Sequence, residues 1–121
     1  MSRLHGVRIN PAHLISNLLF QILKNMPTYA RFEDLPVWQE AIQLAEGCED
    51  FIEAAKGSIT WSKRDQIDRA SLSVSNNIAE GFERGTTKEL LAFLYIARGS
   101  AGEVRSMLCL QAQLYDLPRL P

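Results

Sequence analysis

The sequence has few of the residues that build metal, redox or catalytic centres. Its two cysteines, Cys48 and Cys109, form no metal or redox spacing, and its two histidines, His5 and His13, lie near the N-terminus. Metal ligands and general acid–base groups come largely from these residue types. We therefore predict no metal site and no cofactor. Both cysteines fall in helical patterns, which favours reduced apolar residues and a cytoplasmic protein.

A long, uninterrupted hydrophobic run is also absent. Residues 10 to 27, NPAHLISNLLFQILKNMP, predict a short amphipathic helix with Asn10 as N-cap, Pro11 in the first turn and Pro27 beyond its end. Polar residues interrupt its apolar stripe, so we do not expect a membrane span, and the segment is a poor match to the core of a secretory signal. Either this helix docks on the main domain or a neighbouring subunit, or it precedes a native start at Met26.

Acidic residues are missing from residues 1 to 30, and all 14 lie from Glu33 onward, so the main domain is mildly acidic. Nucleic-acid binding needs clustered Lys and Arg, so a dominant phosphate-binding surface is not expected. A local patch remains open. Its candidate residues are Lys63, Arg64, Arg69, Arg84, Lys88, Arg98 and Arg105. Acids lie among them, a mixture that is more typical of a salt-bridged helical surface.

Helical periodicity, by contrast, is abundant. Apolar residues spaced by 3 and 4 predict three long helices, one of about 20 residues from Leu35, one over residues 63 to 83 and one from residue 87 to Tyr115. Capping boxes at 62–65 and 86–89 mark two starts, and Gly85 is placed to cap the second helix. Short connections make neighbouring helices antiparallel. The sequence thus predicts an all-α, up-and-down bundle.

The predicted bundle domain covers residues 31–117, after an N-terminal extension of residues 1–30 and before a tail of residues 118–121. Three helices leave an open groove, and the prolines after Tyr115 do not support a fourth helix. We therefore expect residues 11 to 25 to fill the fourth position, in the same chain or in a neighbouring one.

The stretch SVSNNIAEG, residues 73 to 81, places a polar row beside an apolar one on the second helix. The third helix carries ARGSAGE at 97 to 103, whose small residues would allow a close approach. These stretches favour a hydrogen-bonded contact between helices or subunits, with a solvated face as the alternative. The residues of this predicted network are Arg69, Ser73, Asn76, Asn77, Glu80, Gly81, Ser100 and Glu103.

No catalytic residues are predicted. Glu80 and Glu103 lack a His or Cys at ligand spacing and a paired base, and the glycines form no phosphate loop because no strand precedes them. Trp61, in the predicted loop before the second helix, either covers the end of the bundle or anchors a partner. The sequence therefore favours a non-enzymatic protein.

Three segments resemble the 23S rRNA-intervening sequence proteins, a four-helix-bundle family. They are RFEDLPVWQEAIQLA at 31 to 45, QIDRASLSVSNNIAEGFERGT at 66 to 86 and ELLAFLYIARGSAGEV at 89 to 104. By position, Asn77, Glu80 and Gly81 match the second motif, and Ser100 and Glu103 match the third. The chain departs from the family in its N-terminal extension and in having no fourth helix after residue 116.

The resemblance implies a cytosolic antiparallel bundle that assembles into rings, with homopentamers as the family's form. Genes of the family occur within intervening sequences of large-subunit rRNA genes, and related accessory proteins of retroelements engage nucleic acid and a reverse transcriptase. Two functions follow as hypotheses. The first is an oligomeric scaffold or accessory protein without membrane contact, and the second is a module that binds RNA, DNA or another nucleic-acid-associated protein.

Overall fold

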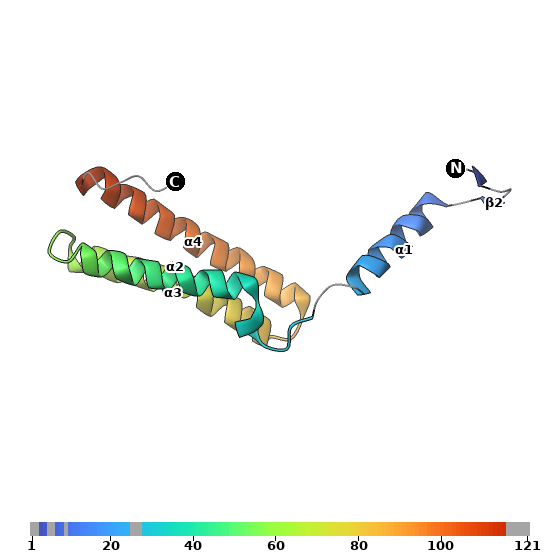
Figure 1. Ribbon diagram of the computed structural model, residues 1–121, viewed down its shortest axis with the longest axis horizontal. Helices are drawn as coiled ribbons and strands as arrows, with labels where there is room; N and C mark the ends of the chain where they lie inside the picture. Colours follow the sequence, from blue (N-terminus) through green and yellow to red (C-terminus); the bar gives the residue numbers. More distant parts are fainter. Residues whose placement is uncertain (1–2, 5–6, 9, 25–27, 116–121) are drawn as a thin grey trace.

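The computed structural model describes residues 3–4, 7–8, 10–24 and 28–115, and most of this chain is helical (Figure 1). Its elements are β1 (Arg3–Leu4), β2 (Val7–Arg8), α1 (Pro11–Lys24), the 3-10 helix η1 (Phe32–Asp34), α2 (Pro36–Ala54), α3 (Trp61–Glu83) and α4 (Thr87–Tyr115). The all-helical class is confirmed for the packed domain from η1 to α4. Met26 and the predicted tail, residues 118–121, lie outside the described residues.

The pair β1 and β2 was not predicted. These strands pair antiparallel, with Arg3 opposite Arg8 and Leu4 opposite Val7. Each strand has two residues, which is too short for any alternation of apolar and polar side chains to be recognised.

Helix α1 begins where the sequence predicts. Pro11 is its first residue, and the side-chain oxygen of Asn10 accepts a hydrogen bond from the backbone N–H of Ala12 at 3.0 Å. Among the described elements, none packs against α1, and in Figure 1 the helix projects away from the other three. The large apolar side chains from Leu14 to Phe20 are therefore exposed to solvent. Within the described part of the chain, no helix has the length and apolar character needed to cross a membrane.

Helix α3 starts two residues earlier than the sequence analysis predicted. Its N-cap is Thr60, whose hydroxyl accepts from the backbone N–H of Lys63 at 3.3 Å, so the predicted cap at Ser62 is wrong. Trp61 is accordingly the first residue of α3 and no longer part of a loop. A Thr and a Ser two positions apart both satisfy the capping preference, and sequence alone gave no reason to choose the first.

The connection from α3 to α4 follows the predicted turn chemistry. Gly85 has a φ of 87°, a left-handed conformation that glycine adopts without steric cost, and its N–H donates to the carbonyl of Phe82. The hydroxyl of Thr86 accepts from the backbone N–H of Glu89 at 3.2 Å and donates to its carboxylate at 2.7 Å. These bonds provide a partner for one of the free backbone N–H groups in the first turn of α4. The turn at Gly85 and the cap at Thr86 together let the chain reverse direction within a few residues.

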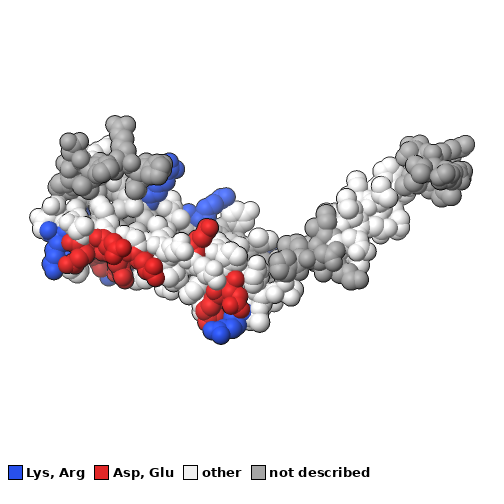
Figure 2. All heavy atoms as spheres, viewed as in Figure 1, with Lys and Arg blue, Asp and Glu red and all other residues white. Residues whose placement is uncertain are grey.

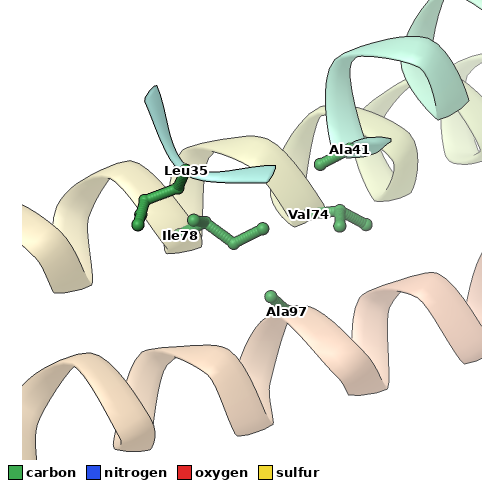
Figure 3. Close-up of a cluster of buried hydrophobic side chains, with 5 residues drawn as sticks. All are labelled: Leu35, Ala41, Val74, Ile78 and Ala97. Atoms are coloured by element: carbon green, nitrogen blue, oxygen red, sulfur yellow. The ribbon is translucent and has the colours of Figure 1, made fainter. Parts of the chain in front are cut away.

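Helix α3 holds the domain together, because α2 and α4 each pack on α3 rather than on each other. Figure 1 shows the chain reversing direction at both connections, so the three helices lie side by side. One core cluster contains Leu35, Ala41, Val74, Ile78 and Ala97 (Figure 3). The second contains Cys48, Ile67, Ala70 and Val104. The core is thus a strip along α3, closed by one helix on each side.

A polar side chain occupies one buried position of α4. Gln111 is 1 % exposed and lies one heptad beyond the buried Val104, but its Oε1 has no hydrogen-bond partner among the described residues. The spacing of apolar residues does not predict this buried position, because glutamine is polar.

Gln111→Met is expected to raise the free energy of unfolding by roughly 1 to 2 kcal/mol, because it replaces a buried amide, whose Oε1 has no partner among the described residues, by an apolar side chain of similar shape. Urea denaturation at a fixed protein concentration measures the change. Gln113→Met, at an exposed position of the same helix, serves as the control and should leave stability nearly unchanged. A loss of stability in the Gln111 variant would contradict the absence of a partner for Oε1.

Candidate functional site

Part of the predicted polar network lies between α3 and α4. The hydroxyls of Ser73 and Ser100 are hydrogen-bonded at 3.0 Å across the two helices. The side-chain amide of Asn77 donates to the carbonyl of Ser73 at 2.7 Å and to its hydroxyl at 3.0 Å. All three residues are half-buried. Their bonds fix the register of α4 against α3, because a shift by one turn would separate the two hydroxyls.

The other polar members of the set face solvent. Arg69 forms an ion pair with Asp65 at 3.0 Å, and Glu80 forms one with Arg84 at 3.1 Å, each one helical turn apart. Asn76 is exposed between them, and together with Leu72 these residues line a shallow hollow on α3. Glu103 is exposed on α4. The structure therefore divides the predicted set into a half-buried contact between helices and an exposed polar surface.

Gly81 is a point of close approach between α3 and α4. A Cβ built at this position would lie 2.5 Å from Cβ of Phe93 and 3.3 Å from Cα of Leu90. By contrast, a Cβ at Gly99 or Gly102 would meet nothing within 4 Å in this chain. The close approach predicted from the small residues of α4 is thus made by the glycine of α3, while the two α4 glycines face outward.

The seven basic residues singled out for nucleic-acid contact do not gather into one patch. Lys63 and Arg64 lie in the first turn of α3, whereas Arg84 directly follows its last residue, so about 30 Å of helix separates them. Lys88 is the second residue of α4, and Arg98 and Arg105 follow farther along that helix. Because screening at physiological salt limits the range of a charge to about 8 Å, Lys63 and Arg64 act independently of Arg84 at the other end of α3.

Acidic side chains dominate the face shown in Figure 2, over the C-terminal half of α2. The exposed acids there are Glu46, Glu49, Asp50 and Glu53. At that end of the domain, Trp61 is 70 % exposed and lines a hollow together with Arg64 and the carboxylates of Glu49, Glu53, Asp65 and Asp68. Trp61 therefore covers little of the core.

The described residues offer no arrangement typical of a metal centre: no three His, Cys, Asp or Glu side chains converge to hold an ion. Cys48 is buried in the core, and burial raises the pKa of its thiol, which keeps it protonated at neutral pH. Cys109 is exposed, and both cysteines are free.

An apolar groove lies open between α2 and α4, with a volume of about 470 Å³. Val74 and Ile78 of α3 form its floor, and Glu40 and Arg98 stand at its edges. The apolar walls are Val37, Ala41 and Leu44 of α2 and Leu94, Ala97 and Ala101 of α4. Figure 3 shows Ala97 facing Val74 and Ile78 across the inner part of this space. A groove lined in this way suits an apolar helix better than a polar small molecule.

Comparison with known proteins agrees with the motifs. The model of a family described as 23S rRNA-intervening sequence protein matches residues 33–117, which contain η1 and α2 to α4. No curated protein and no solved structure gives a match. The match begins after α1, so both the groove and the polar network lie inside the matched region, whereas α1 lies outside it.

Proposed function

Because this chain belongs to the 23S rRNA-intervening sequence protein family, we propose that it is a non-enzymatic scaffold or accessory protein acting as a homo-oligomer in the cytoplasm. The observation that carries this proposal is the amount of apolar surface left uncovered by a single chain. The groove between α2 and α4 and the stripe of α1 are both open to solvent. Surfaces of this kind are typical of protein–protein interaction sites.

The proposal includes an antiparallel, up-and-down four-helix arrangement. Helix α1, from the same chain or from a neighbouring one, takes the fourth position. Helices α2, α3 and α4 supply three sides of such a bundle, and their connections are short enough for neighbouring helices to alternate in direction. A closed ring of identical subunits, with a homopentamer as the expected form, would bury the remaining apolar surface through one repeated contact.

A non-enzymatic role is supported by the pairing of exposed carboxylates with neighbouring arginines. Glu80 is engaged with Arg84, and Glu33 with Arg31, in solvent-exposed ion pairs. A catalytic acid or base needs a cleft or a charged neighbour that shifts its pKa towards neutrality and orients a substrate. Ion pairs between exposed side chains occur on many protein surfaces and do not require a catalytic explanation.

The test is the absolute mass of the purified full chain by light scattering, at low and at moderate salt, with the absorbance ratio at 260 and 280 nm read across the same peak. We expect a salt-stable mass near five times 13.6 kDa without nucleic acid. A single-chain mass at micromolar concentration would overturn the proposed homo-oligomer. A smaller closed oligomer would keep the scaffold and correct the number of subunits.

The alternative function, binding of RNA or of another nucleic-acid-associated protein, is favoured by one feature of α4. The guanidinium of Arg98 lies 5.0 Å from the ring centroid of Tyr95, and Tyr95 is 64 % exposed. Such a pair combines a charge with an aromatic face on which a base could stack. In a ring, the pair would be repeated once in each subunit, and avidity would rise accordingly.

Two results together would make this alternative the preferred function. The protein would retain RNA in a way that weakens steeply with added salt, and Arg98→Ala would abolish that retention. Gln113→Ala, also exposed on α4, is the matched control. A protein that retains no RNA even at low salt would leave the scaffold as the better description.

A further inference from the structure

The apolar stripe of α1 has no partner among the described residues of its own chain. Leu14, Ile15, Leu18 and Leu19 share one side of the helix, and each is between 54 % and 61 % exposed. Asn17 lies on the opposite side. None of the other described elements contacts α1. An apolar surface of this size on an isolated helix is expected to be covered by another surface.

The groove between α2 and α4 matches the stripe in length. The apolar lining runs from Val37 to Leu44 on α2 and from Leu94 to Ala101 on α4, and each wall extends for about 10 Å. The stripe of α1, from Leu14 to Leu19, extends for about 8 Å. Alanines at the inner positions of both walls leave room for branched side chains of a fourth helix. The groove can therefore receive the stripe along its whole length.

Charge does not oppose this pairing. Glu40 and Arg98, which carry opposite charges, stand at the edges of the groove. Between Pro11 and Leu23 the sequence of α1 contains no Asp, Glu, Lys or Arg. Insertion of α1 would therefore bury no unpaired charge in the groove.

The path of the chain leads α1 away from its own groove. The segment before α2 enters through η1, which packs on α2 and α3 and not on α4. Figure 1 shows α1 beyond the end of the domain where α3 connects to α4, clear of all three long helices. Each copy therefore presents both an uncovered helix and an uncovered groove.

We propose that α1 of a neighbouring copy of this chain lies in the groove between α2 and α4. The inference rests on the proposed homo-oligomer and names the contact that builds it. Helix and groove are different surfaces of one chain, so each copy gives its α1 to the next and receives another in return. A head-to-tail contact of this kind closes into a ring when the rotation between copies permits.

Photo-crosslinking of the full chain tests the contact directly. Leu18 is replaced by p-benzoylphenylalanine in unlabelled protein, which is mixed with an equal amount of ¹⁵N-labelled protein and allowed to exchange before irradiation. We expect crosslinked peptides that join α1 of an unlabelled (light) chain to a groove segment, residues 37–44 or 94–101, of a ¹⁵N-labelled (heavy) chain. Adducts that are only light-to-light, or that lie outside the groove, would overturn the proposal.

Two substitutions at exposed positions test the two surfaces one at a time, because one disrupts only the helix and the other only the groove. Leu18→Asp places a charge on the stripe, and Val37→Asp places one on the α2 wall, where the parent side chain is 44 % exposed. Each variant alone should have the mass of one chain, and their equimolar mixture should form a complex of two, because one intact helix meets one intact groove. Asn17→Asp adds the same charge on the other side of α1 and should keep the parent mass.

The outcomes distinguish the two proposals. If the parent is a single chain at all concentrations, the homo-oligomer itself fails. If the parent is an oligomer and Leu18→Asp remains one of equal mass, the oligomer stands and the α1 contact is wrong. Circular dichroism of both variants checks that α2 to α4 remain folded, which is expected since Leu18 touches no other described element.

Discussion

Gly81→Ala is expected to lower the free energy of unfolding by at least about 2 kcal/mol, because the added methyl group would overlap α4. The new Cβ would lie 2.5 Å from Cβ of Phe93, an atom fixed to the backbone of α4, so no side-chain rotation relieves the overlap. The backbone of Leu90 at 3.3 Å limits movement on the other side. The two helices must therefore separate, which also weakens the hydrogen bond between Ser73 and Ser100.

The matched controls for this substitution are Gly99→Ala and Gly102→Ala. Neither added methyl group would meet an atom within 4 Å in the single chain, so each is expected to stabilise α4 by up to roughly 1 kcal/mol through higher helix propensity. Guanidinium denaturation, monitored by circular dichroism, gives the three values. A Gly81→Ala variant as stable as the parent would contradict the close approach. Destabilisation at Gly99 or Gly102 would instead place a second chain against α4.

Ile67→Ala is expected to lower the free energy of unfolding by about 3 to 4 kcal/mol, as large-to-small changes at fully buried positions do. Ile67 is 0 % exposed and belongs to the cluster with Cys48 on α2, Ala70 on α3 and Val104 on α4. Its side chain therefore contributes to both helix pairings. Removing three carbon atoms there leaves a cavity between three helices, and the small neighbours Cys48 and Ala70 cannot fill it.

Two milder changes calibrate this result. Ile67→Val removes one methyl group and should cost about 1 kcal/mol. Ile96→Val makes the same change at a 52 % exposed position of α4 and should alter stability by less than about 0.5 kcal/mol. All variants are compared at one protein concentration, because an oligomer gains apparent stability with concentration. Equal losses at positions 67 and 96 would contradict the burial of Ile67.

The helices themselves could be predicted from local patterns. The Asn10 cap, the Thr86 cap and the left-handed Gly85 all act within a few residues, so sequence spacing is enough to place them. The start of α3 was misplaced by two residues because Thr60 and Ser62 are equally suited as caps. Buried Gln111 was missed, since its burial comes from packing and not from its own polarity.

The polar stretch of α3 illustrates how far pattern reasoning reaches at the candidate site. Spacing alone grouped eight residues on neighbouring helix rows. The tertiary structure brings only Ser73, Asn77 and Ser100 into mutual contact and leaves Arg69 and Glu80 in exposed ion pairs. The rotation of α3 against α4 decides which polar residues meet, and a wheel drawn for one helix does not contain that angle.

The sequence by itself determined the helical class, the approximate helix ends and the family, because these depend on periodicity, capping and motifs that local interactions govern. Only the tertiary structure decided that Gly81 is a point of close approach between α3 and α4, that the seven basic residues are dispersed and that α1 stands apart from an open groove. Each of these depends on distances between segments far apart in the chain. Such distances follow from the packing of whole helix faces, which single residues do not encode.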